Sequence, residues 1–274
     1  MIPAHSSTGT VLDSIIEGVI EDMGARKATT SPSRMQKLAA EVSPARDAHA
    51  ALVGGRDNPA GVGIIAEVKR ASPSVGPLSN IESPAELAAQ YAAGGAAAIS
   101  VLTEQRRFNG SLADFDAVRA RVDVPLLRKD FTVDEYQIYE ARAHDADIVL
   151  LIVAALDDAQ LRDYLALTHE LGMNALVETH TVEEIERAAA VEAPIVGINV
   201  RNLKTLEVDT SHYGTLADQL PDAVIRVAES GVKEAQDVAM YAAQGADAVL
   251  VGEALVRHGE PSQAITDFRQ ASRP

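Results

Sequence analysis

The sequence predicts an α/β protein: a (β/α)8 TIM barrel with extra N-terminal helices. Strand-like apolar runs alternate with helical segments eight times between residues 62 and 271. Alternating βα units build a parallel sheet, and eight of them in a domain of this length close it into a barrel. The competing fold, an open doubly wound sheet, would have a glycine-rich phosphate turn after its first strand. Here that turn reads KRASPS, which favours the barrel.

The first 60 residues predict a helical extension packed on the barrel, which itself covers 61–274 within a single domain. Residues 1–10 read as a loose tail, and 54–63 as a loop rich in Gly, Pro, Asn and Asp. In the first helix, Val11, Ile15, Val19 and Met23 repeat at helical spacing. The predicted helices of the extension are 10–26, 33–41 and 45–52.

The strands and helices of the barrel are predicted from the spacing of apolar residues and from the residues that mark helix ends. The predicted strands are 62–68, 97–102, 124–128, 147–152, 174–178, 195–199, 224–228 and 247–251. The predicted helices are 83–94, 111–121, 134–144, 157–171, 181–191, 210–219, 232–244 and 261–271. Ser83 followed by Pro84 marks a helix start, and Thr181 with Glu184 predicts a capping box.

Composition narrows the class of protein. The chain has 274 residues, 47% hydrophobic and 23% charged, which is typical of a globular protein with a sizeable core. It has no apolar run of the roughly 18 residues that a membrane span needs, no secretory signal and no cysteine. We therefore expect a cytoplasmic chain without membrane contact.

The charge balance limits the classes of molecule that the chain can be expected to bind. A net charge of −16 argues against nucleic acid, which requires a basic surface, and means that an anionic substrate must be attracted locally. The seven histidines show no metal-binding spacing, and we interpret each as a surface or satisfied core residue. No long apolar patch stands out, which favours a monomer.

The stretch IIAEVKRASPS, residues 64–74, is the most informative one in the chain. Alternation along a strand places Glu67 and Lys69 on one face. Two charges on the inward face of a core strand are costly unless they pair or serve a function. From this stretch alone, a structural ion pair and a functional site are equally good interpretations of Glu67 and Lys69.

The residues at the ends of the other strands favour the interpretation as a functional site. In this fold the chemistry lies at the carboxyl ends of the strands. Charged and polar residues stand at those ends along the whole chain, whereas Gly, Ala, Pro and Asp turns occupy the opposite ends. The residues at the carboxyl ends are Glu67, Lys69, Ser72, Glu104, Arg128, Lys129, Asp130, Glu178, His180, Asn199, Arg201, Glu229 and Glu253.

One side of this rim predicts an anion site and the other an apolar one. We expect Ser230-Gly231 and Gly252 to begin the last two helices, where free N–H groups and the helix dipole favour a phosphate. Phe108, Phe131, Leu203 and Pro73 could hold a flat apolar group on the other side.

The motifs IIAEVKRASPS, LTEQRRFNGS, LLRKDF, LVETH, IVGINVRNLKTL and VAESGV, in this order, resemble indole-3-glycerol phosphate synthase of tryptophan biosynthesis. The resemblance covers about 62–255 and extends to the N-terminal helices, in the stand-alone form of the family. It implies a carboxy-lyase that closes the ring of 1-(2-carboxyphenylamino)-1-deoxyribulose 5-phosphate, releasing carbon dioxide and water. It implies a small anionic substrate, no cofactor and no metal.

The resemblance also implies roles for the rim residues. Lys129 would be the general acid at the ketone oxygen, with its pKa lowered by a second cation and by partial desolvation. Lys69 would hold the substrate carboxylate and share in protonating the departing hydroxyl. Glu178 would transfer the proton of the dehydration. Glu67, Asn199 and Glu229 would orient the lysines and the sugar hydroxyls.

The remaining residues would bind substrate. The implied pocket wall, around the anthranilate ring and beside it, is Pro73, Phe108, Phe131, Leu150, Arg201 and Leu203. The implied phosphate site is Ser72, Ser230, Gly231 and Gly252. The next position is often Ser in the family and is Glu253 here, so its backbone N–H would donate while its carboxylate points away.

Three alternatives stay open. A phosphoribosylanthranilate isomerase would need a Cys base, which this chain lacks. A Schiff-base aldolase would use Lys129 as a nucleophile rather than as an acid. A non-catalytic sugar-phosphate-binding barrel would have no use for Lys129 and Glu178.

Overall fold

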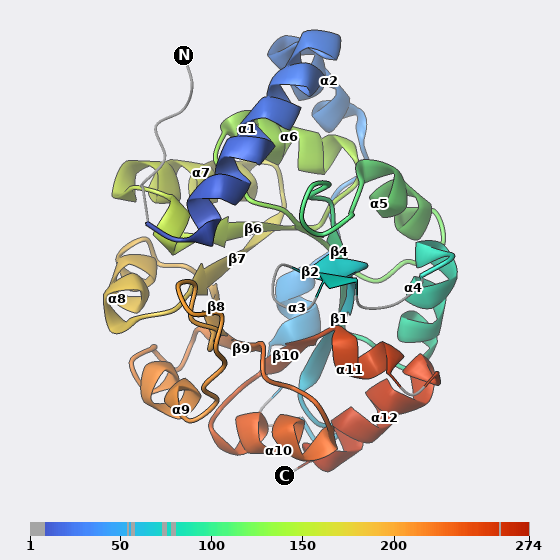
Figure 1. Cartoon of the computed structure of the whole chain (residues 1–274), viewed down its shortest axis with the longest axis vertical. Coiled ribbons are helices and arrows are strands. Elements are labelled where there is room, and N and C mark those ends of the chain that lie inside the picture. Colours follow the sequence, from blue (N-terminus) through green and yellow to red (C-terminus); the bar gives the residue numbers. More distant parts are fainter. Residues whose placement is uncertain are drawn as a thin grey trace.

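The computed structural model describes residues 9–53, 55, 58–72, 76–77, 81–257 and 259–273. Eight parallel strands form a closed barrel in the order β1-β10-β9-β8-β7-β6-β5-β4, with helices around it (Figure 1). The predicted fold class is therefore confirmed. The strands are β1 (Gly63–Val68), β4 (Ala98–Leu102), β5 (Leu126–Lys129), β6 (Ile148–Ile152), β7 (Asn174–Thr179), β8 (Ile195–Asn199), β9 (Ile225–Glu229) and β10 (Ala248–Val251).

The strands are apolar along most of their length because both of their faces are covered. Side chains on one face fill the barrel and those on the other meet the helices, so Ile64, Ile65, Leu126 and Leu127 are all at most 1% exposed. Strand β5 begins later than predicted and runs on to Lys129. That lysine is therefore fixed by the barrel rather than by a loop.

Most outer helices begin within one residue of the predicted start, but those predicted from 210 and 232 begin at His212 and Ala235. Ser83 caps the first of them, with Pro84 at its first position, and Asp157 and Gln160 form a capping box on another. The helices are α4 (Pro84–Ala93), α5 (Leu112–Arg119), α6 (Glu135–Ala143), α7 (Asp158–Glu170), α8 (Val182–Ala190), α9 (His212–Ala217), α10 (Ala235–Ala243), α11 (Glu253–Val256) and α12 (Pro261–Ala271). The short α11 was not predicted, because four residues carry no helical period.

The N-terminal helices are α1 (Val11–Thr29), α2 (Pro32–Glu41) and α3 (Ala48–Leu52). Helix α1 extends beyond its predicted end at residue 26 and lies across one side of the barrel rim (Figure 1). Its Leu12 and Ile16 belong to the same buried core as the barrel strands, whereas Met23 packs with Met35 and Tyr136. The extension and the barrel thus share a hydrophobic core.

A buried ion network joins α1 to the strand that carries Lys129. Arg128, 2% exposed, lies 3.1 Å from Asp130 and 2.8 Å from Glu140, and Glu140 accepts at 2.7 Å from Arg26 of α1. Thr103 on the neighbouring chain segment donates to Asp130 at 2.5 Å. Each charge is therefore matched, as burial requires.

Smaller elements lie between the barrel strands. After β1, strands β2 (Ala71–Ser72) and β3 (Gly76–Pro77) form a short antiparallel pair, and a 3-10 helix, η2 (Val153–Ala155), follows β6. None of the helices in the described part of the chain is long and apolar enough to cross a membrane.

Candidate active site

A cavity of about 230 Å³ opens at the carboxyl ends of the strands. The predicted site residues line it, apart from Pro73, which lies outside the described residues. They are Glu67, Lys69, Ser72, Phe108, Lys129, Phe131, Leu150, Glu178, Asn199, Arg201, Leu203, Glu229, Ser230, Gly231, Gly252 and Glu253. The convergence of strand ends in a barrel grouped most of the charged residues, Leu150 was named only through the family resemblance, and Glu104, Arg128 and His180 at the same strand ends do not line the cavity.

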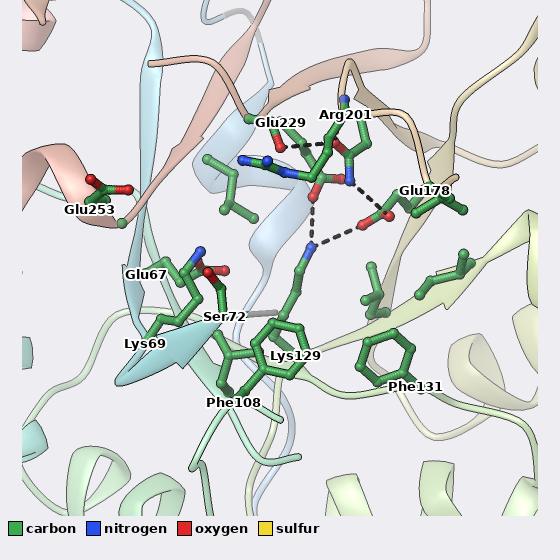
Figure 2. A pocket seen from close by; sticks show the side chains of 18 of the residues that line it. Glu67, Lys69, Ser72, Phe108, Lys129, Phe131, Glu178, Arg201, Glu229 and Glu253 are labelled. Atoms are coloured by element: carbon green, nitrogen blue, oxygen red, sulfur yellow. Dashed lines mark hydrogen bonds and ion pairs between the residues drawn. The ribbon is translucent and has the colours of Figure 1, made fainter. Parts of the chain in front are cut away.

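Lys129 occupies the centre of the cavity, between two carboxylates. Its Nζ lies 3.0 Å from Oε2 of Glu178 and 2.7 Å from Oε2 of Glu229 (Figure 2). Burial alone would lower the pKa of Lys129, but the charges of Glu178, Glu229 and Glu67 outweigh it, so the pKa is raised. The expectation of a pKa lowered by a second cation was wrong, because the nearest charged groups are carboxylates.

The two carboxyl groups differ in acidity. Burial and the neighbouring charge of Glu178 raise the pKa of Glu229 to about 8. Burial also opposes ionisation of Glu178, but Lys129 and His180 outweigh it, so the pKa of Glu178 lies well below its usual range. The two carboxyl groups and the ammonium therefore titrate as one coupled set, in which Glu178 is the more acidic carboxyl group and Glu229 the less acidic one.

A glycine in β8 makes room for Glu229. A Cβ atom on Gly197 would lie 2.1 Å from Oε1 of Glu229 and 3.3 Å from Cδ1 of Leu176. That oxygen is buried and has no hydrogen-bond partner within the described residues. The absence of a side chain at Gly197 therefore sets the position of the Glu229 carboxyl group.

Asn199 connects Glu178 to Ser230, which follows the next strand of the barrel. Its Nδ2 donates to Oε1 of Glu178 at 3.1 Å, and its Oδ1 accepts from Ser230 Oγ at 2.9 Å. The same Oδ1 accepts from the backbone N–H of Arg201 at 3.1 Å. These bonds fix the orientation of the Asn199 amide and, through it, that of Glu178.

Glu67 and Lys69 form the predicted ion pair on one side of the cavity (Figure 2). The carbonyl of Glu67 accepts from Tyr91 at 3.2 Å, which ties the strand end to α4. A Cβ atom on Gly252 would lie 3.0 Å from Oε1 of Glu67, so Gly252 leaves space for this carboxylate as well. The Lys69 side chain is 23% exposed at this edge of the cavity, whereas that of Glu67 is 3% exposed.

On the side of the cavity where a phosphate is predicted to bind, the backbone differs from the helix start that we expected. Helix α10 begins at Ala235, so Ser230 and Gly231 precede it by a loop and do not begin it. Both residues have positive φ, 71° and 82°. For Ser230 this left-handed conformation is strained, and it is held by Tyr241, which donates to the Ser230 carbonyl at 3.0 Å. The loop presents backbone N–H groups without a helix.

Gly252 and Glu253 lie at the other edge of this side. Gly252 is the N-cap of α11, which is separate from the predicted helix at 261–271, because Pro261 begins a new helix there. The Glu253 carboxylate accepts from Arg257 at 2.6 Å, one turn along. This carboxylate, at the edge of the cavity, is therefore paired with a cation of its own helix segment.

The opposite side of the cavity is apolar. The rings of Phe108 and Phe131 lie 5.9 Å apart at 40°, and Leu150 and Leu203 complete this wall. Buried Glu104 shapes the loop that carries Phe108 by accepting from the N–H groups of residues 106, 107 and 108, at 2.7–3.0 Å. An aromatic ring can therefore bind here next to the lysines.

Two parts of the site were missed in the sequence. Val11, Leu12 and Ile15 of α1 also line the cavity, although their helical spacing predicted only an apolar face. His180 is buried, and its Nε2 lies 3.4 Å from Oε1 of Glu178. Its position directly after a strand end was the available signal, which the interpretation as an ordinary histidine disregarded.

The described residues contain no group of three or more His, Cys, Asp or Glu side chains able to hold a metal ion. What they bring together is an acid–base set: the Lys129 ammonium, two carboxyl groups of different acidity, and a second lysine at the edge of the cavity. An apolar wall and a loop rich in N–H groups flank this set.

The chain is similar to known proteins over nearly its whole length. The family model described as indole-3-glycerol phosphate synthase matches residues 12–268. The indole-3-glycerol phosphate synthase of Micrococcus luteus is 63% identical over 96% of this chain and 98% of its own length. That of Paenarthrobacter aurescens is also 63% identical, over 96% of both chains.

A solved structure of 3-hexulose-6-phosphate synthase is similar in fold. It is 17% identical, with a TM-score of 0.62, and covers 76% of this chain and 99% of that one. At this identity the likeness concerns the barrel alone. The family match and the curated relatives go further, and they cover nearly the whole sequence. The chain belongs to the indole-3-glycerol phosphate synthase family.

Proposed function

We propose that the cavity at the strand ends is where this chain performs the family's reaction. The substrate is 1-(2-carboxyphenylamino)-1-deoxyribulose 5-phosphate, and the products are indole-3-glycerol phosphate, carbon dioxide and water. The single observation that supports this best is the placement of Lys129 between Glu178 and Glu229, with an apolar wall on one side and Lys69 on another.

Lys129 is the general acid of the ring closure. As the ring carbon bonds to the ketone carbon, the ketone oxygen gains charge and needs a proton. The raised pKa of Lys129, which its carboxylate neighbours cause, keeps the proton available at neutral pH. Protonation of a neighbouring carboxylate would remove one of these attractions and make the ammonium more acidic, so proton transfers at the two groups are coupled.

Glu178 is the base of the dehydration. It is ionised, and its two oxygens are held by Lys129 and Asn199, so one geometry is imposed on the proton transfer. After carbon dioxide has left, Glu178 takes a proton from the ring or the sugar side while the hydroxyl departs as water. Glu229 and Glu67 orient the lysines in this scheme.

Lys69 binds the substrate carboxylate and shares in protonating the departing hydroxyl. Its partner Glu67 keeps the ammonium at the cavity edge until the substrate competes for it. The phosphate binds at the other end, at Ser72, Ser230, Gly231 and Gly252, with the N–H of Glu253 as a further donor. Phe108, Phe131, Leu150, Leu203 and Arg201 surround the anthranilate ring and the chain that joins it to the sugar.

A direct test is product formation by the purified chain. Incubation with synthetic substrate should produce indole-3-glycerol phosphate, detected by its indole fluorescence, without added metal or cofactor. Absence of product from folded protein would contradict the proposal. The protonated state of Lys129 argues against the aldolase alternative, since only a neutral amine attacks a carbonyl.

We further propose that the chain works in the cytoplasm as a monomer, and that residues 1–60 and 61–274 unfold as one domain. The biosynthetic family supports the location, and the core shared by α1 and the barrel supports the single domain. The expectations that neither nucleic acid nor membrane is a partner rest on charge and sequence.

A further inference from the structure

His180 is oriented by a carboxylate that the sequence assigned to a different task. Thr181 caps α8 by accepting from the N–H of Glu184 at 3.2 Å, which is half of the predicted capping box. The Glu184 carboxylate does not complete the box. It accepts instead from the backbone N–H of His180 at 2.7 Å and from ring Nδ1 of His180 at 3.1 Å.

These two bonds leave the other ring nitrogen directed at the catalytic carboxylate. His180 Nε2 lies 3.4 Å from Oε1 of Glu178, the side chain of His180 is 8% exposed, and that of Glu178 is 5% exposed. Nε2 is buried and forms no hydrogen bond to another described residue. The imidazole is not among the residues that line the cavity, so it reaches the chemistry only through Glu178.

The charged groups around this pair come from three elements. Glu184 of α8 faces the ring, and Lys129 of β5, which also contacts Glu229 of β9, donates to Oε2 of Glu178. The uncharged amide of Asn199 on β8 donates to Oε1, the oxygen that His180 approaches. Arg187 of α8 is directed elsewhere, to Asp158 and two backbone carbonyls. The ring is thus placed between two carboxylates, which favours its protonated form.

We propose that His180 is a positioning residue for the family's reaction: held by Glu184, it presents a positive charge to Oε1 of Glu178 and so fixes the orientation and the ionised state of this base. The inference rests on the proposed function, which assigns Glu178 its role. Two cations then share Glu178, with Lys129 at Oε2 and His180 near Oε1. Burial alone would lower the pKa of His180, but the negative charges of Glu178 and Glu184 outweigh it and raise the pKa to about 10, which agrees with this arrangement.

The test is the pH profile of turnover for His180→Asn, with His144→Asn as its control. His144 is paired with Asp116 on the outer helices, 2.6 Å away, so its variant should match the wild type. Removing the charge of His180 should raise the pKa of Glu178 and shift the acid limb of kcat upward by about one pH unit. On that limb turnover falls about tenfold, while KM stays within about twofold.

A second pair of variants guards against misfolding of His180→Asn. Glu184→Gln should shift the acid limb in the same direction by a smaller amount, and Glu183→Gln, at the adjacent exposed position, should leave it in place. In the double variant of His180 and Glu184 the shift should equal that of His180→Asn alone. In the unmodified chain, nitrogen NMR of the His180 ring should show both nitrogens protonated from pH 6 to 8.

Superimposable acid limbs for the wild type and a folded His180→Asn variant would overturn the inference while leaving the function intact. If His180→Asn does not fold, an unshifted limb in Glu184→Gln would do the same. A neutral His180 ring at pH 7 would overturn the inference whether or not the chain turns over substrate. A wild type without product contradicts the proposed function instead.

Discussion

Oε2 of Glu229 lies 2.7 Å from the ammonium of Lys129, and yet the pKa of the Glu229 carboxyl group is raised, to about 8. Burial and the charge of Glu178 both disfavour a second carboxylate, and the shared lysine compensates only in part. The three groups therefore titrate as a unit in which one ammonium serves one full negative charge. This arrangement makes several predictions.

The first concerns stability and pH. A raised pKa means that folded Glu229 binds a proton which the unfolded chain releases above its ordinary pKa of 4.5, so Glu229 lowers stability as pH rises from about 4.5 to 8. Glu229→Gln removes this loss. Relative to the wild type, the free energy of unfolding of the variant should rise by up to about 1.4 kcal/mol per pH unit in this window.

Denaturant unfolding at several pH values measures this difference. Glu41→Gln, at an exposed position on α2, is the control and should follow the wild-type curve. A constant difference between Glu229→Gln and the wild type from pH 5 to 8 would contradict the assigned charge state.

The second concerns the space beside Glu229. In Gly197→Ala the new methyl group overlaps Oε1 of Glu229, so the carboxyl group must move away from Lys129. We expect a cost of about 1–3 kcal/mol in stability from overpacking. Turnover should fall on the order of 100-fold from the displaced group. Gly24→Ala has open space in α1 and should be stable and fully active, and equal activity of both variants would refute the packing argument.

The third concerns the buried network behind β5. Glu140→Ala removes the partner of fully buried Arg128, which leaves that charge with Asp130 alone, so we expect a loss of about 3–5 kcal/mol. Glu135→Ala lies on the exposed face of the same helix and should cost less than about 0.5 kcal/mol. Thermal and denaturant unfolding of both variants measure the contrast, and similar losses would show that burial of the network contributes nothing.

The fourth separates acid catalysis from a Schiff base at Lys129. Borohydride added with a keto-sugar phosphate should trap no adduct, because the ammonium between Glu178 and Glu229 is not nucleophilic. Mass spectrometry of the intact chain and its peptides provides the measurement. A reduced adduct on Lys129 would favour the aldolase mechanism.

The fold and most site residues were predictable because each depends on local pattern plus one general rule. The spacing of apolar residues and the helix caps predicted the alternation of strands and helices. Because a closed barrel brings the carboxyl ends of all its strands to one rim, Lys129, Glu178 and Glu229 could be grouped without coordinates. Residues near the end of the first strand, such as Glu67 and Lys69, followed from alternation alone.

What could not be predicted depends on distances across the barrel. The sign of the Lys129 pKa shift depends on a contact with Glu229, 100 residues away in sequence. The direction of the His180 ring depends on Glu184 leaving its expected capping bond. The course of α1 over the cavity depends on the ion pairs that join Arg26 to Arg128 through Glu140. The start of α10 depends on the loop before it, in which Ser230 has a positive φ. None of these has a periodic signature.

The most direct measurement of the central claim is turnover, by product fluorescence, of Lys129→Ala and Glu178→Gln beside Lys27→Ala. Lys27 pairs with Asp134 between α1 and α6, so its variant controls for the loss of a lysine elsewhere. We predict that the first two variants stay folded by circular dichroism and form no detectable indole-3-glycerol phosphate, while Lys27→Ala remains active. Near-normal product formation by folded Lys129→Ala or Glu178→Gln would contradict the assignment of acid and base.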